Sequence, residues 1–128
     1  MQKARSSTLL LFPLVLALAA CDRGGTGSEP GGEYRAVLQS PNGAEGAAAI
    51  ELTGPGIQSV TASAGRIFTQ NAENTTRVVI VHEPAAEIAF TVTMARGNGP
   101  PDARVVEVAD GNDQPRASLA GYRVTFRR

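Results

Sequence analysis

Tryptophan is absent from this chain of 128 residues, and cysteine and histidine occur once each, at Cys21 and His82. A single cysteine excludes a disulfide within the chain. One cysteine and one histidine also fall short of the three or four ligands that a zinc site of the Cys/His type requires. The chain is long enough for one domain, which must then be held together by a hydrophobic core.

A surplus of positive charge is missing as well, since 12 basic residues stand against 12 acidic ones. Two of the basic residues, Lys3 and Arg5, lie within the first five positions. The rest of the chain therefore carries slightly more acidic than basic residues. We expect no nucleic-acid binding, because it usually shows as a basic patch or stripe.

The first twenty residues have the three parts of a secretory signal peptide. Lys3 and Arg5 form a basic start, residues 9–18 are almost entirely apolar, and two alanines precede Cys21. The apolar stretch is shorter than the roughly 20 residues that a membrane-spanning helix needs. The sequence therefore predicts that residues 1–20 are a leader that is cleaved during export.

The leader ends in Leu18-Ala19-Ala20-Cys21, which resembles the lipobox of bacterial lipoproteins. The resemblance implies cleavage before Cys21 and attachment of a diacylglyceryl group to its thiol. Two or more acyl chains anchor a protein stably, because each buried CH₂ contributes about 0.8 kcal/mol. We therefore expect an exported protein held by lipid on Cys21 at the inner or the outer membrane.

The residues after Cys21 divide into a tether and a folded domain. Residues 22–32 are rich in glycine and contain no apolar side chain, which is typical of a flexible linker. We predict a signal peptide over 1–20, the lipidated cysteine and its tether over 21–32, and one domain over 33–128.

The domain shows an apolar period of two, which is typical of strands with one face on a core. The alternating sets are Tyr34, Ala36 and Leu38; Ala48, Ile50 and Leu52; Ile88, Phe90, Val92 and Met94; and Tyr122, Val124 and Phe126. Val78-Val79-Ile80-Val81 is continuously apolar, which predicts a central strand buried on both faces. Shorter strands are expected at 57–60, 66–68 and 105–108.

Turn signals separate these strands, the clearest being Asn42-Gly43, since both residues tolerate the positive φ angles of tight hairpins. Further turns are expected at 53–56, 71–76, Glu83-Pro84, 97–102 and 110–115. About eight short strands without a helical segment predict an all-β fold, an antiparallel β-sandwich or a small barrel.

A family likeness extends over residues 34–126. It is carried by residues 48–57, Val60, Gly65, Phe68, 77–81 and 88–92. Their order resembles the strands of cohesin-like domains, which are jelly-roll sandwiches that bind dockerin modules or serve as adhesion and scaffold modules. The resemblance implies a sandwich of about eight strands that binds another protein, and it assigns no binding residues.

The oxygen-rich segment Asp110-Gly111-Asn112-Asp113 is the best candidate for a metal site. Calcium takes six to eight oxygen ligands, and Asp110, Asn112 and Asp113 offer side-chain oxygens. The spacing does not match the loop of helix-loop-helix calcium sites, and a solvated turn explains the same residues.

Catalytic residues are harder to find. His82 follows an expected strand, and no nucleophile motif accompanies it. A glycan hydrolase needs two carboxylates about 5–10 Å apart, for which Glu51, Glu83, Glu87 and Glu107 are available. Glu51 and Glu107 alternate with apolar residues and are expected on solvent-facing sides of strands.

The sequence favours a binding or scaffold module without a catalytic site or cofactor, anchored by Cys21 and meeting another exported protein. Two alternatives stay open: a small envelope enzyme acting on glycans, and a calcium-dependent adhesion module that uses the 110–113 segment. The sequence does not indicate an oligomeric state.

Overall fold

The computed structural model describes residues 31–128, which form eight β-strands and no helix. The strands are β1 Gly32–Gln39, β2 Glu45–Thr53, β3 Ile57–Thr61, β4 Arg66–Ala72, β5 Thr75–Ala86, β6 Ala89–Met94, β7 Asp102–Ala109 and β8 Arg123–Arg127. This part of the chain therefore contains no helix that could cross a membrane. The predicted leader, Cys21 and nearly all of the tether lie outside the described residues.

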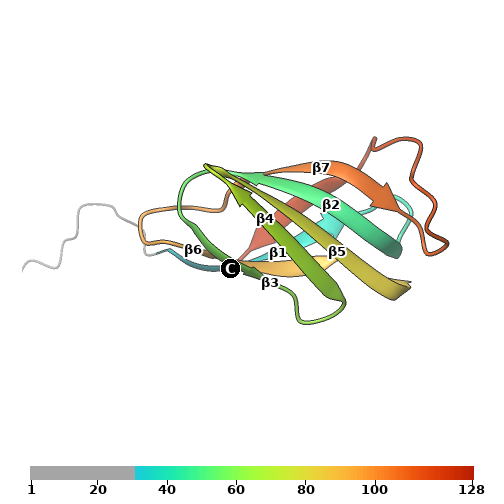
Figure 1. Cartoon of the computed structure of the whole chain (residues 1–128), viewed down its shortest axis with the longest axis horizontal. Coiled ribbons are helices and arrows are strands. Elements are labelled where there is room, and N and C mark those ends of the chain that lie inside the picture. The colour runs from blue at the N-terminus through green and yellow to red at the C-terminus, as the bar shows by residue number, and fades with distance from the viewer. Residues whose placement is uncertain (1–30) are drawn as a thin grey trace, which may run out of the picture.

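The strands form two four-stranded antiparallel sheets that face each other (Figure 1). Sheet A has the order β3-β6-β1-β8, and sheet B has the order β4-β5-β2-β7. Every strand pairing is antiparallel. The predicted all-β sandwich of about eight strands is confirmed.

The core lies between the sheets and is built from alternate residues of the strands, as the period of two predicts. Ala36, Ile50, Leu52 and Val92 are fully buried, and Phe90 is 2% exposed. The remaining buried hydrophobic residues are Tyr34, Leu38, Ala48, Val78, Ile80, Ile88, Met94 and Val108.

The continuous apolar run in β5 does not have the surroundings that the sequence predicts. Val78 and Ile80 are buried, but Val79 and Val81 lie half-exposed on the outer side of sheet B. The prediction of a strand buried on both faces is wrong, because no second layer covers this side of the sheet in the described part of the chain. The valines therefore belong to an open surface.

Two predicted turns also differ from the structure. The turn expected over 71–76 is confined to Glu73 and Asn74, so β4 and β5 form a hairpin with a two-residue loop. At Glu83-Pro84, strand β5 continues to Ala86 instead of turning. Its pairing with β2 slips there, and an irregular stretch suits proline, which cannot donate to the ladder.

Candidate functional site

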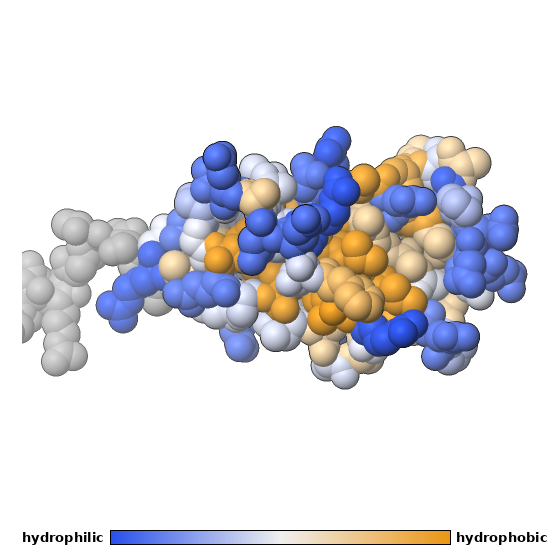
Figure 2. All heavy atoms as spheres, viewed as in Figure 1, coloured by the Kyte–Doolittle hydropathy of each residue, from blue (hydrophilic) through white to orange (hydrophobic). Residues whose placement is uncertain are grey.

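The outer face of sheet B carries an apolar patch at its centre. It consists of Ala47 and Ala49 from β2, Phe68 from β4, Val79 and Val81 from β5, and Ala109 from β7. Figure 2 shows hydrophobic residues gathered over the middle of the face that Figure 1 presents, with hydrophilic residues around them. We call these six residues the sheet-B patch.

The register of the strands places the patch in two neighbouring rows. Phe68 lies opposite Val79, and Val79 lies opposite Ala49. In the next row, Val81 is opposite Ala47, which is opposite Ala109. These rows are continuous because side chains two residues apart in each strand point to the same face.

Small side chains make part of the patch concave. Ala47, Ala49, Val79, Glu107 and Ala109 border a shallow depression of about 170 Å³, and Ala48 forms the rest of its lining. Alanine fills little of the space above a sheet, so an aliphatic side chain of another molecule fits there. Glu107 is the one charged group at its border.

A row of charged side chains bounds the patch on one side. The Glu51 carboxylate accepts from Arg77 Nη2 at 3.4 Å and from Arg104 Nη2 at 3.2 Å. On the other side of the patch, Arg66 stands at the start of β4, opposite Val81 in register. The three arginines outnumber Glu51 and Glu107, so the border of the patch carries an excess of one positive charge.

The outer face of sheet A has a different character. Arg35, Thr91 and Arg127 lie in one row there, and Gln39 Nε2 donates to Thr125 Oγ1 at 3.1 Å. These side chains are polar, and they are solvated without a partner protein. The two faces of the sandwich therefore differ, and the apolar one is the candidate for binding.

The predicted calcium ligands lie in the loop between β7 and β8, where they build a turn. Asp110 Oδ1 accepts from the backbone N–H groups of Asn112 at 2.8 Å and Gln114 at 3.0 Å. These bonds from Gln114 and Asn112 hold the pKa of Asp110 below its usual value. Asp113 adopts a φ of 61° in this turn. Residues 31–128 contain no group of three or more His, Cys, Asp or Glu placed to hold a metal ion.

The other residues considered for catalysis lie on separate elements. His82 is near the end of β5, and its Nε2 is buried without a hydrogen-bond partner. Glu87 is exposed and pairs with Arg35 at 3.7 Å, while Glu51 is held between two arginines on sheet B. Glu83 is exposed on β5, and Glu107 borders the sheet-B depression.

A buried ion pair at the end of the sandwich was not predicted from the sequence. Glu45, at the start of β2, is 1% exposed. Its Oε1 accepts from Ser40 Oγ at 2.7 Å and from the Tyr122 hydroxyl at 2.6 Å, and its Oε2 accepts from Arg116 Nε at 3.1 Å. We call Glu45, Ser40, Arg116 and Tyr122 the Glu45 cluster. It joins the β1–β2 turn to the long loop between β7 and β8.

The cluster keeps Glu45 ionised. Burial by itself raises the pKa of Glu45, but hydrogen bonds from Tyr122, Ser40 and Arg116, with the charge of Arg116, outweigh it and lower the pKa. The same pair raises the pKa of Arg116. The alternating pattern places Tyr34 and Tyr122 on the core side of the strands; Tyr34 is buried, and Tyr122 is only partly buried against the core. The Tyr34 hydroxyl accepts from Arg128 Nη2 at 3.0 Å.

Gly46 allows the loop to approach β2 this closely. A Cβ atom at position 46 would overlap the backbone carbonyl of Asp110. The loop is also held by a bond of 2.7 Å from the Arg116 N–H to the Val108 carbonyl. The cluster is thus fully occupied by contacts within the chain, and we assign it a role in stability.

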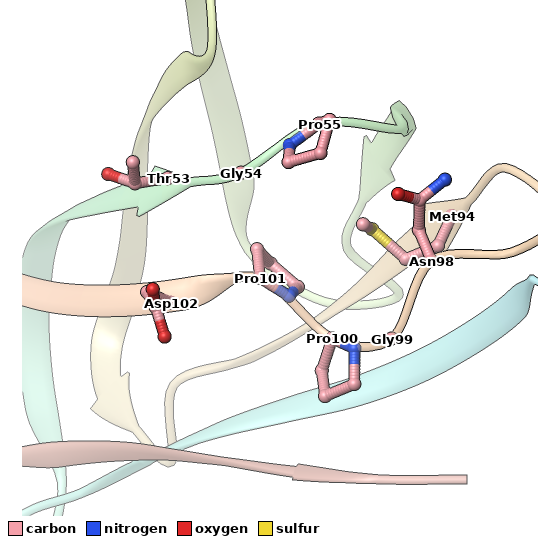
Figure 3. A pocket seen from close by; sticks show the side chains of 9 residues that line it. All are labelled: Thr53, Gly54, Pro55, Met94, Asn98, Gly99, Pro100, Pro101 and Asp102. Atoms are coloured by element: carbon pink, nitrogen blue, oxygen red, sulfur yellow. The ribbon is translucent and has the colours of Figure 1, made fainter.

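A further hollow of about 200 Å³ lies between the β2–β3 and β6–β7 loops (Figure 3). Pro55 on one loop and Pro100 and Pro101 on the other flank it, with Met94 and Asn98 close by. The Asn98 amide donates to the Ala95 carbonyl at 3.3 Å, so it serves the loop itself. No arrangement of polar groups in this hollow specifies a ligand.

The fold and the surface together define a two-sheet antiparallel β-sandwich with one apolar, uncovered sheet face. Comparison of the chain with protein-family models, with curated proteins and with solved structures gives no match.

Proposed function

We propose that this protein is a lipid-anchored binding module of a bacterial cell envelope, which holds another exported protein on the sheet-B patch. The observation that carries the binding role is the pair of apolar rows on an uncovered sheet face. Apolar side chains at this position are unfavourable in water unless a partner covers them, and contiguous exposed patches of this kind mark interaction sites.

The chemistry of the patch indicates the surface it fits. The depression beside Ala47 and Ala49 accepts an aliphatic side chain, such as leucine or methionine, from a partner. Arg77 and Arg104 share the one carboxylate of Glu51, and Arg66 lies on the other side of the patch. Carboxylates of a partner are therefore favoured over these arginines and disfavoured beside Glu107, because complementary charges steer association and fix orientation. The proposed partner is therefore a folded protein with a protruding aliphatic residue and with acidic groups placed to meet these arginines.

The cohesin-like order of the segments supports the same proposal, since such domains serve as adhesion and scaffold modules. The lipobox-like end of the leader supports anchoring at Cys21. A glycine-rich tether then lets the sandwich stand off the lipid headgroups and reorient toward a partner.

The anchor is tested by mass spectrometry of the chain purified from membranes. We expect a protein that begins at Cys21 and carries the added mass of a diacylglyceryl group, with or without a further acyl chain. A Cys21→Ala variant is expected to leave the membrane fraction. An unmodified cysteine or an intact leader in the wild type would contradict the proposed anchor.

The binding face is tested with Ala49→Arg, which fills the depression and adds a charge to its centre. A matched control, Thr91→Arg, places the same side chain on the outer face of sheet A. We expect that a protein captured from envelope extracts by the wild type is retained by Thr91→Arg and lost by Ala49→Arg. With that protein purified, calorimetry should show binding about tenfold or more weaker for Ala49→Arg.

Three results count against this face. In one, Ala49→Arg binds the purified partner as tightly as the wild type. In another, the Thr91→Arg control loses binding instead. In the third, no protein depends on either position. Circular dichroism of both variants establishes that they are folded before the comparison is made.

A further inference from the structure

One sheet edge of this sandwich is left open while the others are protected. Strand β3 is short, and its pairing with β6 is irregular between Ile57 and Ser59. The end of β7 is covered by the returning loop, through a bridge between Ala109 and Pro115. Strand β8 has an arginine at each end, and charged residues are a common protection of edges.

Strand β4 lacks these protections. It pairs with β5 over its whole length, from Arg66 to Ala72, without a bulge, and it contains no proline. Its one charged residue, Arg66, is at its start. Among residues 31–128, Phe68 is the exposed large hydrophobic residue, with 57% of its surface accessible. Such an edge is a template for pairing with another strand.

The hairpin turn determines which backbone groups of β4 are free. In a two-residue hairpin the closing pair, here Ala72 and Thr75, exchanges both of its hydrogen bonds across the strands. Hydrogen-bonded pairs alternate with non-hydrogen-bonded pairs along an antiparallel ladder. The N–H and C=O groups of Gln70, Phe68 and Arg66 are therefore also directed to β5. Ile67, Thr69 and Asn71 direct theirs to the open edge.

We infer that β4 pairs with β4 of a second copy of this chain, antiparallel and centred on Phe68. Residues that face each other in an antiparallel pair point their side chains to the same side of the sheet. When two identical strands pair about a two-fold axis, this condition is met only if the axis passes through one residue and its copy. Centred on Phe68, Ile67 faces Thr69 of the second copy, and Arg66 faces Gln70 of the second copy.

This register favours a second copy over other strands because β4 is complementary to itself. The free groups of Ile67 and Thr69 meet each other twice, once on each side of the axis. The two phenylalanines form a close, non-hydrogen-bonded pair, in which aromatic side chains stabilise sheets. The single charge of each strand meets a neutral amide, so like charges do not face each other.

The pairing joins the two B sheets into one sheet of eight strands. Each copy contributes a row of Phe68, Val79 and Ala49, and the two rows meet at the pair of phenylalanines to form one continuous row. This doubles the sheet-B patch without covering it, so dimerisation and partner binding are compatible. Pairing of one short strand buries less than the roughly 1,200 Å² of stable interfaces, so we expect a weak, reversible dimer.

The test is sedimentation equilibrium of the full chain over concentrations up to about 500 µM, a range suited to weak, transient interfaces. Thr69→Pro removes an edge-facing N–H but no bond to β5, and Thr69→Val is the control that keeps this N–H. We expect wild type and Thr69→Val to dimerise equally. We expect the dissociation constant of Thr69→Pro to rise about tenfold or more, since proline on an open edge blocks pairing.

Hydrogen exchange gives an independent reading of the register. The N–H groups of Ile67 and Thr69 should exchange more slowly as the concentration of the chain rises, while exposed amides of the 110–113 loop stay unchanged. A chain that remains monomeric overturns the inference, as does a dimer that Thr69→Pro leaves intact. Thr69→Pro leaves Ala49 and the depression unchanged, so this variant should still capture the envelope partner. Loss of dimerisation and loss of partner binding can therefore be told apart.

Discussion

Replacing Glu45 with alanine is expected to lower the free energy of unfolding by about 3 kcal/mol, the lower end of the cost of breaking a buried ion pair. The substitution leaves the Arg116 guanidinium and the Tyr122 hydroxyl without the acceptor they share. The cost stays at the lower end because the Arg116 side chain is 27% exposed and can reach water. Urea denaturation followed by circular dichroism measures the loss, as a lower midpoint with an unchanged slope.

This loss is large for a domain of this size, whose total stability is expected to be about 5–15 kcal/mol. Glu45→Gln is the second variant in case the alanine variant does not fold, because glutamine keeps the shape and can still accept hydrogen bonds. We expect a smaller loss for glutamine, since it lacks the charge that faces Arg116. A loss below about 0.5 kcal/mol for the alanine variant, as at an ordinary surface site, would mean that the loop is held without the Glu45 cluster.

The same cluster sets a dependence on pH. The pKa of Glu45 lies below its ordinary value of 4.5 in the folded chain. Its stabilisation is therefore complete above about pH 4.5 and is lost as the pH falls through the folded pKa. We expect the unfolding midpoint of the wild type to fall more steeply below pH 4.5 than that of Glu45→Gln. Asp110, whose pKa is also lowered, accounts for part of the slope that remains in the variant.

The second large effect is expected in the core, where Phe90→Ala should cost about 3–5 kcal/mol. Phe90 lies on β6 opposite Ala36 and is 2% exposed, so its removal leaves a cavity between the sheets. Equilibrium unfolding in urea measures this difference. Phe68→Ala is the matched control, because it removes the same ring from a site that is 57% exposed.

We expect the control to change the free energy of unfolding by about 0.5 kcal/mol or less, as for ordinary surface substitutions. Equal losses at the two positions would mean that the burial of β6 differs from the structure. A loss below about 1 kcal/mol for Phe90→Ala would place the alternation of β6 out of register with the core.

The strands could be predicted because their signal is local. Residues such as Ala48, Ile50 and Leu52 alternate with polar or small neighbours, and a strand turns alternate side chains to opposite faces. Eight such segments without a helical one define an all-β fold. Phe90 could be placed in the core for the same reason, without knowledge of its partner Ala36.

The site could not be predicted in this way. The sequence reported that Val79 and Val81 are apolar, but burial depends on whether another layer covers them, and that is decided by distant parts of the chain. The sequence did contain a sign of the patch. Residues 78–81 are four apolar residues in a row, whereas a strand with one buried face needs an apolar residue only at every second position. The prediction that this strand is buried on both faces left no exposed apolar residues for a patch on the outer face of sheet B.

Glu45 shows the same limit for polar residues. Its position at the start of a strand is typical of a solvated glutamate, and its partners Arg116 and Tyr122 lie more than seventy residues away.

The sequence by itself determined the single cysteine, the approximate strand positions and the class of fold, and it predicts a leader over residues 1–20. These depend on the order and spacing of neighbouring residues. Only the tertiary structure decided which sheet face is open, which edge is unpaired and which acid is buried. Each of these follows from how the two sheets and the β7–β8 loop lie against one another, because burial is a property of the whole fold and not of a segment.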